Sequence, residues 1–223
     1  MTVSRKFHND EFYHTYNRGV DKRKIFRDYS DERRFLKGCK QFRYESPTLL
    51  RSATEHDAPV ESSEKVQLLV DLASFCLMGN HYHALCKQRM DGGISKFMSK
   101  LSSGYTKYFN KRWERSGYLF QSRFQDEHID DDGYLLRVLC YIHANPLVYF
   151  QADWKKEGLR DINGALDFLS RYRHSSHRHY MALEDISWIR SKFIEDILPR
   201  GKEYQGFFTE YLQSVRPAGL DGG

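Results

Sequence analysis

Residues 76–86, CLMGNHYHALC, decide how the sequence is best interpreted. The stretch is apolar at both ends, with a glycine–asparagine pair at 79–80 that favours a tight turn. It therefore predicts two buried strands joined by that turn. Side chains alternate between the two faces of a strand, so His81 and His83 lie on one face. Valine or isoleucine would pack there without the cost of desolvating an imidazole, which makes the histidine pair a candidate site.

Patterns on both sides of these strands predict the remaining elements. We expect strands at 11–20, 66–78, 81–88 and 122–130, and helices at 30–45, 94–113 and 132–146. Ser30 is the expected N-cap of the first helix, and Pro146 ends the third. The order β-α-β-β-α-β, followed by a helix, predicts an α+β protein with a ferredoxin-like split βαβ fold. Its antiparallel sheet should carry helices on one face.

The chain divides into a predicted catalytic domain at 1–150 and an extension at 151–223. Within the first part, polar and proline-bearing residues at about 45–65 predict a long exposed loop. The extension is basic and histidine-rich around 171–180. We expect one or two helices at 185–213 and a frayed tail after them.

Composition limits the class of protein. The 223 residues are 40% hydrophobic, enough for a sizeable core, and the net charge of +5 with a pI of about 8.9 permits a polyanionic partner. No apolar run approaches the length of a membrane span, and the N-terminus has no apolar signal segment. We therefore expect a cytoplasmic, nucleoid-associated protein with no membrane partner. Four scattered cysteines should be buried and unpaired: Cys39, Cys76, Cys86 and Cys140.

Two further residues complete a possible metal site. Tyr141 and Asn145 are four apart on a predicted helix and share one face. An amide oxygen can bind a hard cation, and a phenol can act as a nucleophile. Two imidazoles with oxygen ligands and no thiolate suit Mg²⁺ or Mn²⁺. Taken singly, each pattern is better explained structurally: the histidines as hydrogen-bonded sheet residues, Tyr141 as core and Asn145 as a helix cap.

A basic stripe interleaved with aromatic residues runs from Lys96 to Arg123. Such a stripe suits a single DNA strand, because phosphates contact the charges and bases stack on the rings. An ordinary helix, with a solvated charged face and aromatic residues in the core, would account for about half of these residues. Phe97 and Phe109 are the first we assign to the core. The candidate DNA contacts are Lys107, Lys111, Arg112, Arg115 and Arg123, with another cluster at Arg171, Arg173 and Arg178.

Four blocks in this order resemble the single-tyrosine HUH transposases, and most closely the REP-associated tyrosine transposases. The blocks are YHTYNRGVDKRKIF (13–26), MGNHYHAL (78–85), SGYTKYFNKRWERSGYLFQSRF (103–124) and YIHANPL (141–147). The block at 78–85 resembles the family's HUH strand, with Tyr82 as the bulky middle residue, and the block at 141–147 resembles its catalytic helix. Some relatives have glutamine where this chain has Asn145, and the chain beyond about residue 180 does not align.

The resemblance implies a metal-dependent enzyme that cuts and rejoins single-stranded DNA beside hairpins through a 5′-phosphotyrosine. The metal ligands would be His81, His83 and Asn145, the cation Mg²⁺ or Mn²⁺, and the nucleophile Tyr141. Hairpin DNA of a REP element or a transposon end would be the partner. Relatives act as homodimers or as monomers, so the oligomeric state stays open.

Two other functions remain possible from the sequence. One is a DNA-hairpin-binding protein that has lost catalysis. The other is a metal-dependent phosphodiester hydrolase, which needs an acid–base group near the histidine pair; its candidates are Asp71, Asp91, Glu127 and His128. Tyr105 and Tyr108 compete with Tyr141 as nucleophile, but neither has an amide four residues later.

Overall fold

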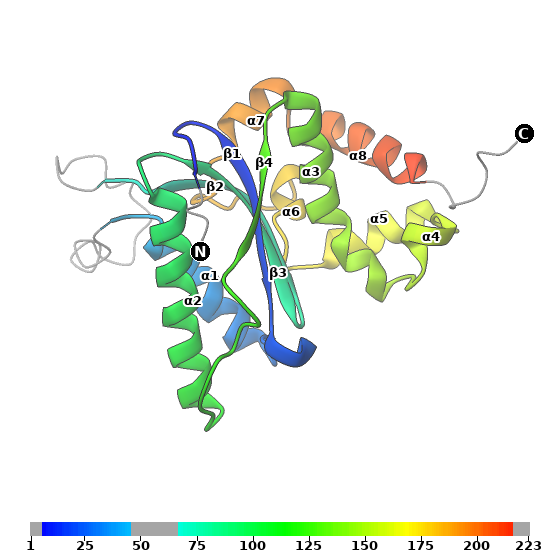
Figure 1. Ribbon diagram of the computed structural model, residues 1–223. Coiled ribbons are helices and arrows are strands. Elements are labelled where there is room, and N and C mark those ends of the chain that lie inside the picture. The colour runs from blue at the N-terminus through cyan, green and yellow to red at the C-terminus, as the bar shows by residue number, and fades with distance from the viewer. Residues whose placement is uncertain (1–5, 46–66, 216–223) are drawn as a thin grey trace, which may run out of the picture.

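The computed structural model describes residues 6–45 and 67–215 (Figure 1). Four antiparallel strands form one sheet in the order β2-β3-β1-β4. The strands are β1 (Phe12–Arg18), β2 (Val70–Met78), β3 (His81–Gln88) and β4 (Gln125–Ile129). With one helix after β1 and another after β3, this topology is ferredoxin-like, and the predicted fold class is confirmed. The loop expected at about 45–65 lies outside the described residues from position 46 onward.

Helices α1 (Tyr29–Phe42) and α2 (Gly93–Arg112) cover one face of the sheet. Their core includes Phe35, Phe97 and Tyr82, so the residue between the two histidines packs on this side. Helix α1 begins one residue before the predicted cap. Asp28, not Ser30, is the N-cap, because its carboxylate accepts hydrogen bonds from the backbone N–H groups of Ser30 and Asp31.

The opposite face of the sheet is covered as well, contrary to the prediction of helices on one face only. Strands β2 and β3 are buried along most of their length on both faces, so each face needs a covering layer. On this side α3 (Asp132–Ala144) packs against the sheet, and the short helix η3 (Asn145–Tyr149) follows it. Beyond these lie α4 (Trp154–Glu157), α5 (Ile162–Arg171), α6 (His177–Tyr180), α7 (Lys192–Ile197) and α8 (Lys202–Ser214).

The C-terminal helices share a hydrophobic core with α3, although the division near residue 150 stays a prediction. Leu139 and Cys140 of α3 pack in one cluster with Tyr204 and Phe208 of α8. The predicted helices in this part of the chain are present, and all four cysteines are buried and unpaired, as expected.

A buried polar network joins α3 to the C-terminal helices. The Tyr204 hydroxyl lies 2.7 Å from His143 Nδ1 and 2.9 Å from His177 Nδ1. The other ring nitrogen of His143 lies 2.8 Å from the Ser176 hydroxyl. All four side chains are buried away from water, so these hydrogen bonds satisfy polar atoms that would otherwise have no partner.

We predict that Tyr204→Phe lowers the free energy of unfolding by about 2 kcal/mol, because two buried imidazole nitrogens lose a shared partner. Urea denaturation followed by circular dichroism measures the change. Tyr29→Phe is the matched control, since Tyr29 is 61% exposed and should lose almost nothing. Equal stabilities of the two variants would contradict a structural role for the network.

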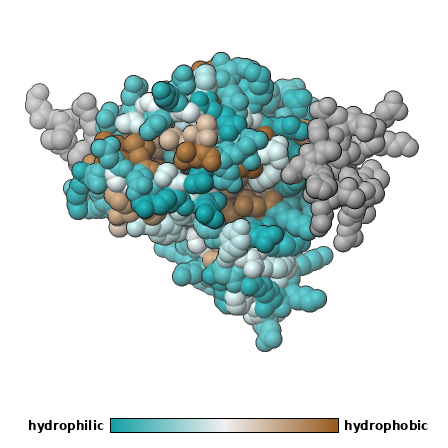
Figure 2. All heavy atoms as spheres, turned by 180° about the vertical axis from the view of Figure 1, so that it is seen from behind, coloured by the Kyte–Doolittle hydropathy of each residue, from teal (hydrophilic) through white to brown (hydrophobic). Residues whose placement is uncertain are grey.

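Among the described residues, no helix combines the length and apolar character that crossing a membrane requires. Seen from behind, the surface is largely hydrophilic, with hydrophobic side chains gathered in a band across its middle (Figure 2). The large hydrophobic residues exposed in the described part of the chain are mostly aromatic, and Tyr118 is the most exposed of them at 88%.

Candidate functional site

A cleft of about 800 Å³ lies on the α3 side of the sheet. Its floor comes from β1, β3 and β4, and its walls come from α3 and α4. The four residues predicted to carry the chemistry all line it: His81, His83, Tyr141 and Asn145. The structure therefore brings together residues from two segments about 60 positions apart in the sequence.

Strand register explains how the floor is built. His83 pairs with Tyr16 across β1 and β3, and His81 pairs with Arg18. Paired residues of antiparallel strands project to the same face, so these side chains form two adjacent rows. His14 lies two residues before Tyr16 and projects to that face too. Tyr82 projects to the other face, as the alternation predicts.

The ring of His14 fixes the ring of His83. His14 Nε2 lies 2.9 Å from His83 Nδ1, and both rings are buried. On its far side, His14 Nδ1 lies 3.8 Å from a carboxylate oxygen of Glu127. One arrangement of protons satisfies these contacts: His83 donates from Nδ1 to His14, and His14 directs its own Nδ1–H toward Glu127. His83 then keeps a lone pair on Nε2.

Asn80 fixes the ring of His81 in a comparable way. The Asn80 amide nitrogen donates to the carbonyl of Lys22 at 3.1 Å, so its oxygen faces His81. That oxygen accepts from His81 Nδ1 at 2.6 Å, which leaves the lone pair of His81 on Nε2. Metal-binding histidines usually donate their second ring N–H to such an outer partner. Both predicted ligands therefore have the outer hydrogen bond that a metal site needs.

All three imidazoles of the cleft are neutral at pH 7. Burial lowers the pKa of His14 to about 4, with the Glu127 charge opposing the effect. Burial, together with the charges of Arg18 and Lys155, lowers the pKa of His81 to about 4. Burial also holds the pKa of His83 well below its usual value. Neutral imidazole is the form that binds a metal ion.

Tyr141 faces the histidines from α3. Its ring centroid lies 5.7 Å from that of His83 and 5.9 Å from that of His14. Burial raises the pKa of the Tyr141 phenol, and a side-chain hydrogen bond with Asn145 and the positive charge of Arg18 oppose that shift. Asn145 donates its amide N–H to the backbone carbonyl of Tyr141 at 2.8 Å. This bond orients the amide and leaves its oxygen free to accept or to bind a cation.

The competing tyrosines lie on the other side of the sheet. Tyr105 is buried in the α1–α2 core, and its hydroxyl donates to the carbonyl of Ile25 at 2.5 Å. Tyr108 packs beside it and donates to Asp31 at 3.1 Å. Neither contacts the histidine pair, so the geometry favours Tyr141.

The candidate acid–base groups separate in the same way. Glu127 lines the cleft, where its carboxylate accepts a hydrogen bond from the Tyr134 hydroxyl. His128 projects away from the cleft, stacks on Tyr13 and lies 2.5 Å from Glu11. Asp71 lines a different cavity, described below, and Asp91 accepts from Asn9 at 2.7 Å. Only Glu127 of the four is near the histidines.

The predicted DNA contacts fall into two groups. Lys107, Lys111 and Arg123 are exposed, with no ion pair among the described residues. Arg112 is engaged within the fold: its guanidinium lies 2.7 Å from carboxylate oxygens of both Asp28 and Asp31.

Arg115 also makes internal contacts, donating to the Asn110 side chain at 2.8 Å. In the C-terminal cluster, Arg171 pairs with Asp167, and Arg178 pairs with Glu184 at 3.1 Å and donates to the Ser170 carbonyl. Arg173 is exposed. The histidines interspersed in that cluster, His177 and His179, are buried in the fold.

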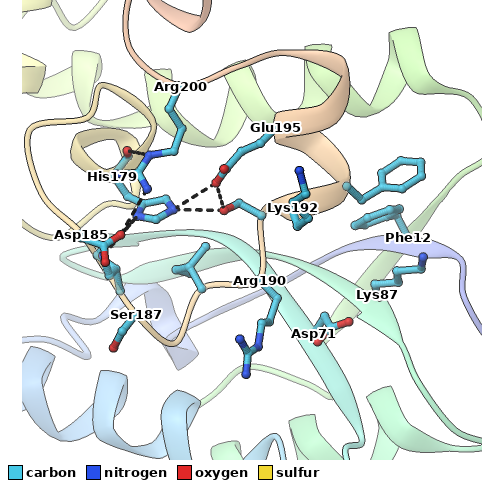
Figure 3. Close-up of a pocket in the computed structure, with 14 residues that line it drawn as sticks. Phe12, Asp71, Lys87, His179, Asp185, Ser187, Arg190, Lys192, Glu195 and Arg200 are labelled. Carbon is cyan, nitrogen blue, oxygen red and sulfur yellow. Dashed lines mark hydrogen bonds and ion pairs between the residues drawn. The ribbon is translucent and has the colours of Figure 1, made fainter. Parts of the chain in front are cut away.

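A second cavity, of about 490 Å³, lies near α7 (Figure 3). At one end of it His179 lies between Glu195 and Asp185, with Arg200 beside it. Arg200 donates to the His179 carbonyl at 2.7 Å and pairs with Asp185 at 3.2 Å. The charged groups around His179 are thus paired with one another. The first cleft, which holds the four predicted residues, is the better candidate site.

Sequence reasoning missed several residues around the histidine pair, including His14, Asn80 and Lys155. His14 had a signal, because it is a polar residue on the inward face of an aromatic strand. Only the pairing of β1 with β3 shows that it reaches His83. Asn80 was recognised as a turn residue alone. Lys155 had no signal, because it comes from α4, which follows the predicted catalytic domain.

Residues 60–145 match the model of the family described as "Transposase IS200 like". This segment contains β2, β3, α2, β4 and α3, and it ends at Asn145. Over these residues the chain is similar to the IS200-like transposases, which supports the family resemblance predicted from the sequence.

The chain is also similar to a solved structure of a REP-associated tyrosine transposase bound to a REP hairpin. The match covers 85% of this chain and 98% of the chain in that structure. Its sequence identity is 14% and its TM-score 0.48. None of the curated proteins matches the chain.

Proposed function

We propose that the protein is a transposase that cuts and rejoins single-stranded DNA, with Tyr141 as its nucleophile and His81, His83 and Asn145 as ligands of Mg²⁺ or Mn²⁺. The observation that carries the proposal is the position of the Tyr141 ring, 5.7 Å from the ring of His83 in one cleft. The family match supports the reaction class, since the matched segment holds all four residues.

The donor set fits a divalent cation. Two neutral imidazoles offer Nε2 lone pairs, and the Asn145 amide offers its oxygen. Within 6–45 and 67–215, no three histidine, cysteine, aspartate or glutamate side chains form a metal-binding cluster, and the Asn145 amide is the third protein ligand that we propose. Such a mixed set leaves coordination positions open for substrate oxygens. A bound cation would neutralise charge on the phosphate and orient it.

The residues of the chain account for the transfer step. The phenol oxygen of Tyr141 forms a bond to phosphorus, and the bond from phosphorus to the 3′-oxygen breaks. The electron pair leaves with the 3′-oxygen, which gains a proton, while the phenol loses one. One phosphodiester replaces another, so the energy of the bond is kept and the 3′-hydroxyl can reverse the step without ATP.

A strand that reaches Tyr141 also needs contacts outside the cleft. We infer that Lys107, Lys111, Arg123 and Arg173 supply phosphate contacts, because their charges are exposed and are not used by the described part of the fold. Arg112, Arg115, Arg171 and Arg178 already make intramolecular contacts, so they rank lower. A hairpin next to the cut strand is the partner that the sequence resemblance implies.

His14 should act as an outer partner of the metal site. We predict that His14→Leu lowers the affinity for Mn²⁺ by about 10- to 100-fold, since His83 loses the hydrogen bond that orients its ring. Isothermal titration calorimetry measures this without any DNA. His128→Leu is the matched control, because that histidine faces away from the cleft. An unchanged Mn²⁺ affinity for His14→Leu would exclude the proposed role of the His14–His83 contact.

Incubation of the protein with hairpin-bearing single-stranded DNA and Mg²⁺ or Mn²⁺, followed by a denaturing gel, tests the function. A metal-dependent covalent protein–DNA band is expected. Cleavage without such a band would favour the hydrolase, with Glu127 as its acid–base group. Binding of every hairpin tested with cleavage of none would favour a protein that has lost catalysis.

A further inference from the structure

Four cations line the cleft, and the reaction as described above uses none of them: Arg18, Arg137, Lys155 and Lys156. Of these, Arg18 and Lys155 are the two whose charges lower the pKa of His81. Arg18 ends β1 and pairs with His81 in the strand register. Lys155 lies on α4, and its ammonium lies 4.5 Å from the centroid of the Tyr141 ring. Both residues line the same cleft as the histidine pair. They approach Tyr141 from different elements, one from the sheet and one from the segment that follows the family match.

The negative charges of the cleft are already engaged. Glu127 accepts from the Tyr134 hydroxyl, and Asp153 pairs with Arg160 at 3.0 Å. Neither Arg18 nor Lys155 has a carboxylate partner in the described ranges. Lys155 is an exposed residue, but its ammonium packs over the rings of Tyr141 and Trp154, and desolvation there lowers its pKa. The unpaired charge of the cleft is therefore positive.

We propose that Lys155 and Arg18 form an anion site over Tyr141 that binds the scissile phosphodiester of the DNA. Lys155 is then a further catalytic residue, supplied from outside the segment that matches the family. An ammonium placed there interacts with a phosphate oxygen and with the charge that passes from the phenol oxygen to phosphorus. Preorganised cations of this kind stabilise a transition state more than the bound substrate. The assignment of the scissile phosphate rests on the proposed function, whereas the anion site itself does not.

The first test needs neither metal nor DNA. Binding of inorganic phosphate to the metal-free protein is followed by NMR for the wild type, Lys155→Met and Lys202→Met. Methionine keeps most of the stem and removes the charge, and Lys202 provides the same substitution at an exposed lysine of α8 outside the cleft. Loss of phosphate binding in Lys155→Met alone supports the site. Equal binding by all three proteins would overturn it, whether or not the protein cuts DNA.

The second test places the phosphate at the reaction centre. Lys155→Met should lower the single-turnover rate of covalent adduct formation on hairpin DNA by about 100-fold, while Lys202→Met changes it little. Mn²⁺ affinity should not fall in Lys155→Met, because a cation is removed from beside the metal ligands. A wild-type rate for fully bound DNA in Lys155→Met would overturn the scissile assignment. If the wild type itself forms no adduct, the proposed function fails, and the phosphate titration still decides the anion site.

Discussion

Tyr141→Phe is expected to reduce covalent adduct formation and DNA cleavage to background, while the protein still binds hairpin DNA and Mn²⁺. The substitution removes the one oxygen that forms the bond to phosphorus and leaves the ring in place between α3 and the histidines. Phenylalanine keeps the apolar contacts of the half-buried ring, so the fold should be preserved. A single-turnover assay with labelled DNA measures the rate, and fluorescence anisotropy measures binding.

Tyr108→Phe is the control for this experiment. Tyr108 lies on the opposite side of the sheet, so its substitution should leave the cleavage rate near that of the wild type. A covalent adduct that survives in Tyr141→Phe and disappears in Tyr108→Phe would assign the nucleophile to the other face of the sheet.

Substitution of the histidine pair should have an effect of nearly the same size. His83→Ala removes a ligand and the ring that His14 orients, and His81→Ala removes the second imidazole. For either variant we expect no measurable Mn²⁺ binding by calorimetry. Cleavage should fall by about 1,000-fold, which corresponds to the several kcal/mol that a bound cation contributes to phosphate chemistry.

His128→Ala tests whether these losses are specific. It removes a histidine of the same sheet that faces away from the cleft, so Mn²⁺ binding and cleavage should both persist. Full metal-dependent activity in His81→Ala and His83→Ala would show that the cation, if one is needed, binds elsewhere.

Much of the fold could be predicted from the sequence because its signals are local. The turn at Gly79 and Asn80 joins two strands that alternate as expected, and every expected core strand and helix in the described residues is present. The prediction that helices cover only one face of the sheet was wrong. The apolar sequence of β2 and β3 shows that these strands are buried, but it does not show which elements cover them. The N-cap of α1 was misplaced because serine and aspartate both cap helices well.

The candidate site was predicted where motif spacing carries the information and missed where contacts are long-range. The spacing of His81 to His83 and of Tyr141 to Asn145 places each pair on one face of its element. The contact between His14 and His83 depends on strand register. The position of Lys155 depends on how α4 packs against the cleft. The number of basic residues in the stripe does not reveal which of them are paired within the fold, as Arg112 is with Asp28 and Asp31.

The identity of the residue that becomes linked to DNA tests the central claim most directly. After reaction with hairpin DNA and Mn²⁺, nuclease trimming and tryptic digestion, mass spectrometry should find the nucleotide adduct on the peptide that follows Arg137. Fragmentation should place it at Tyr141. A nucleotide on Tyr149 of that peptide, or on Tyr105 or Tyr108 of α2, would contradict the account, as would complete cleavage with no modified tyrosine.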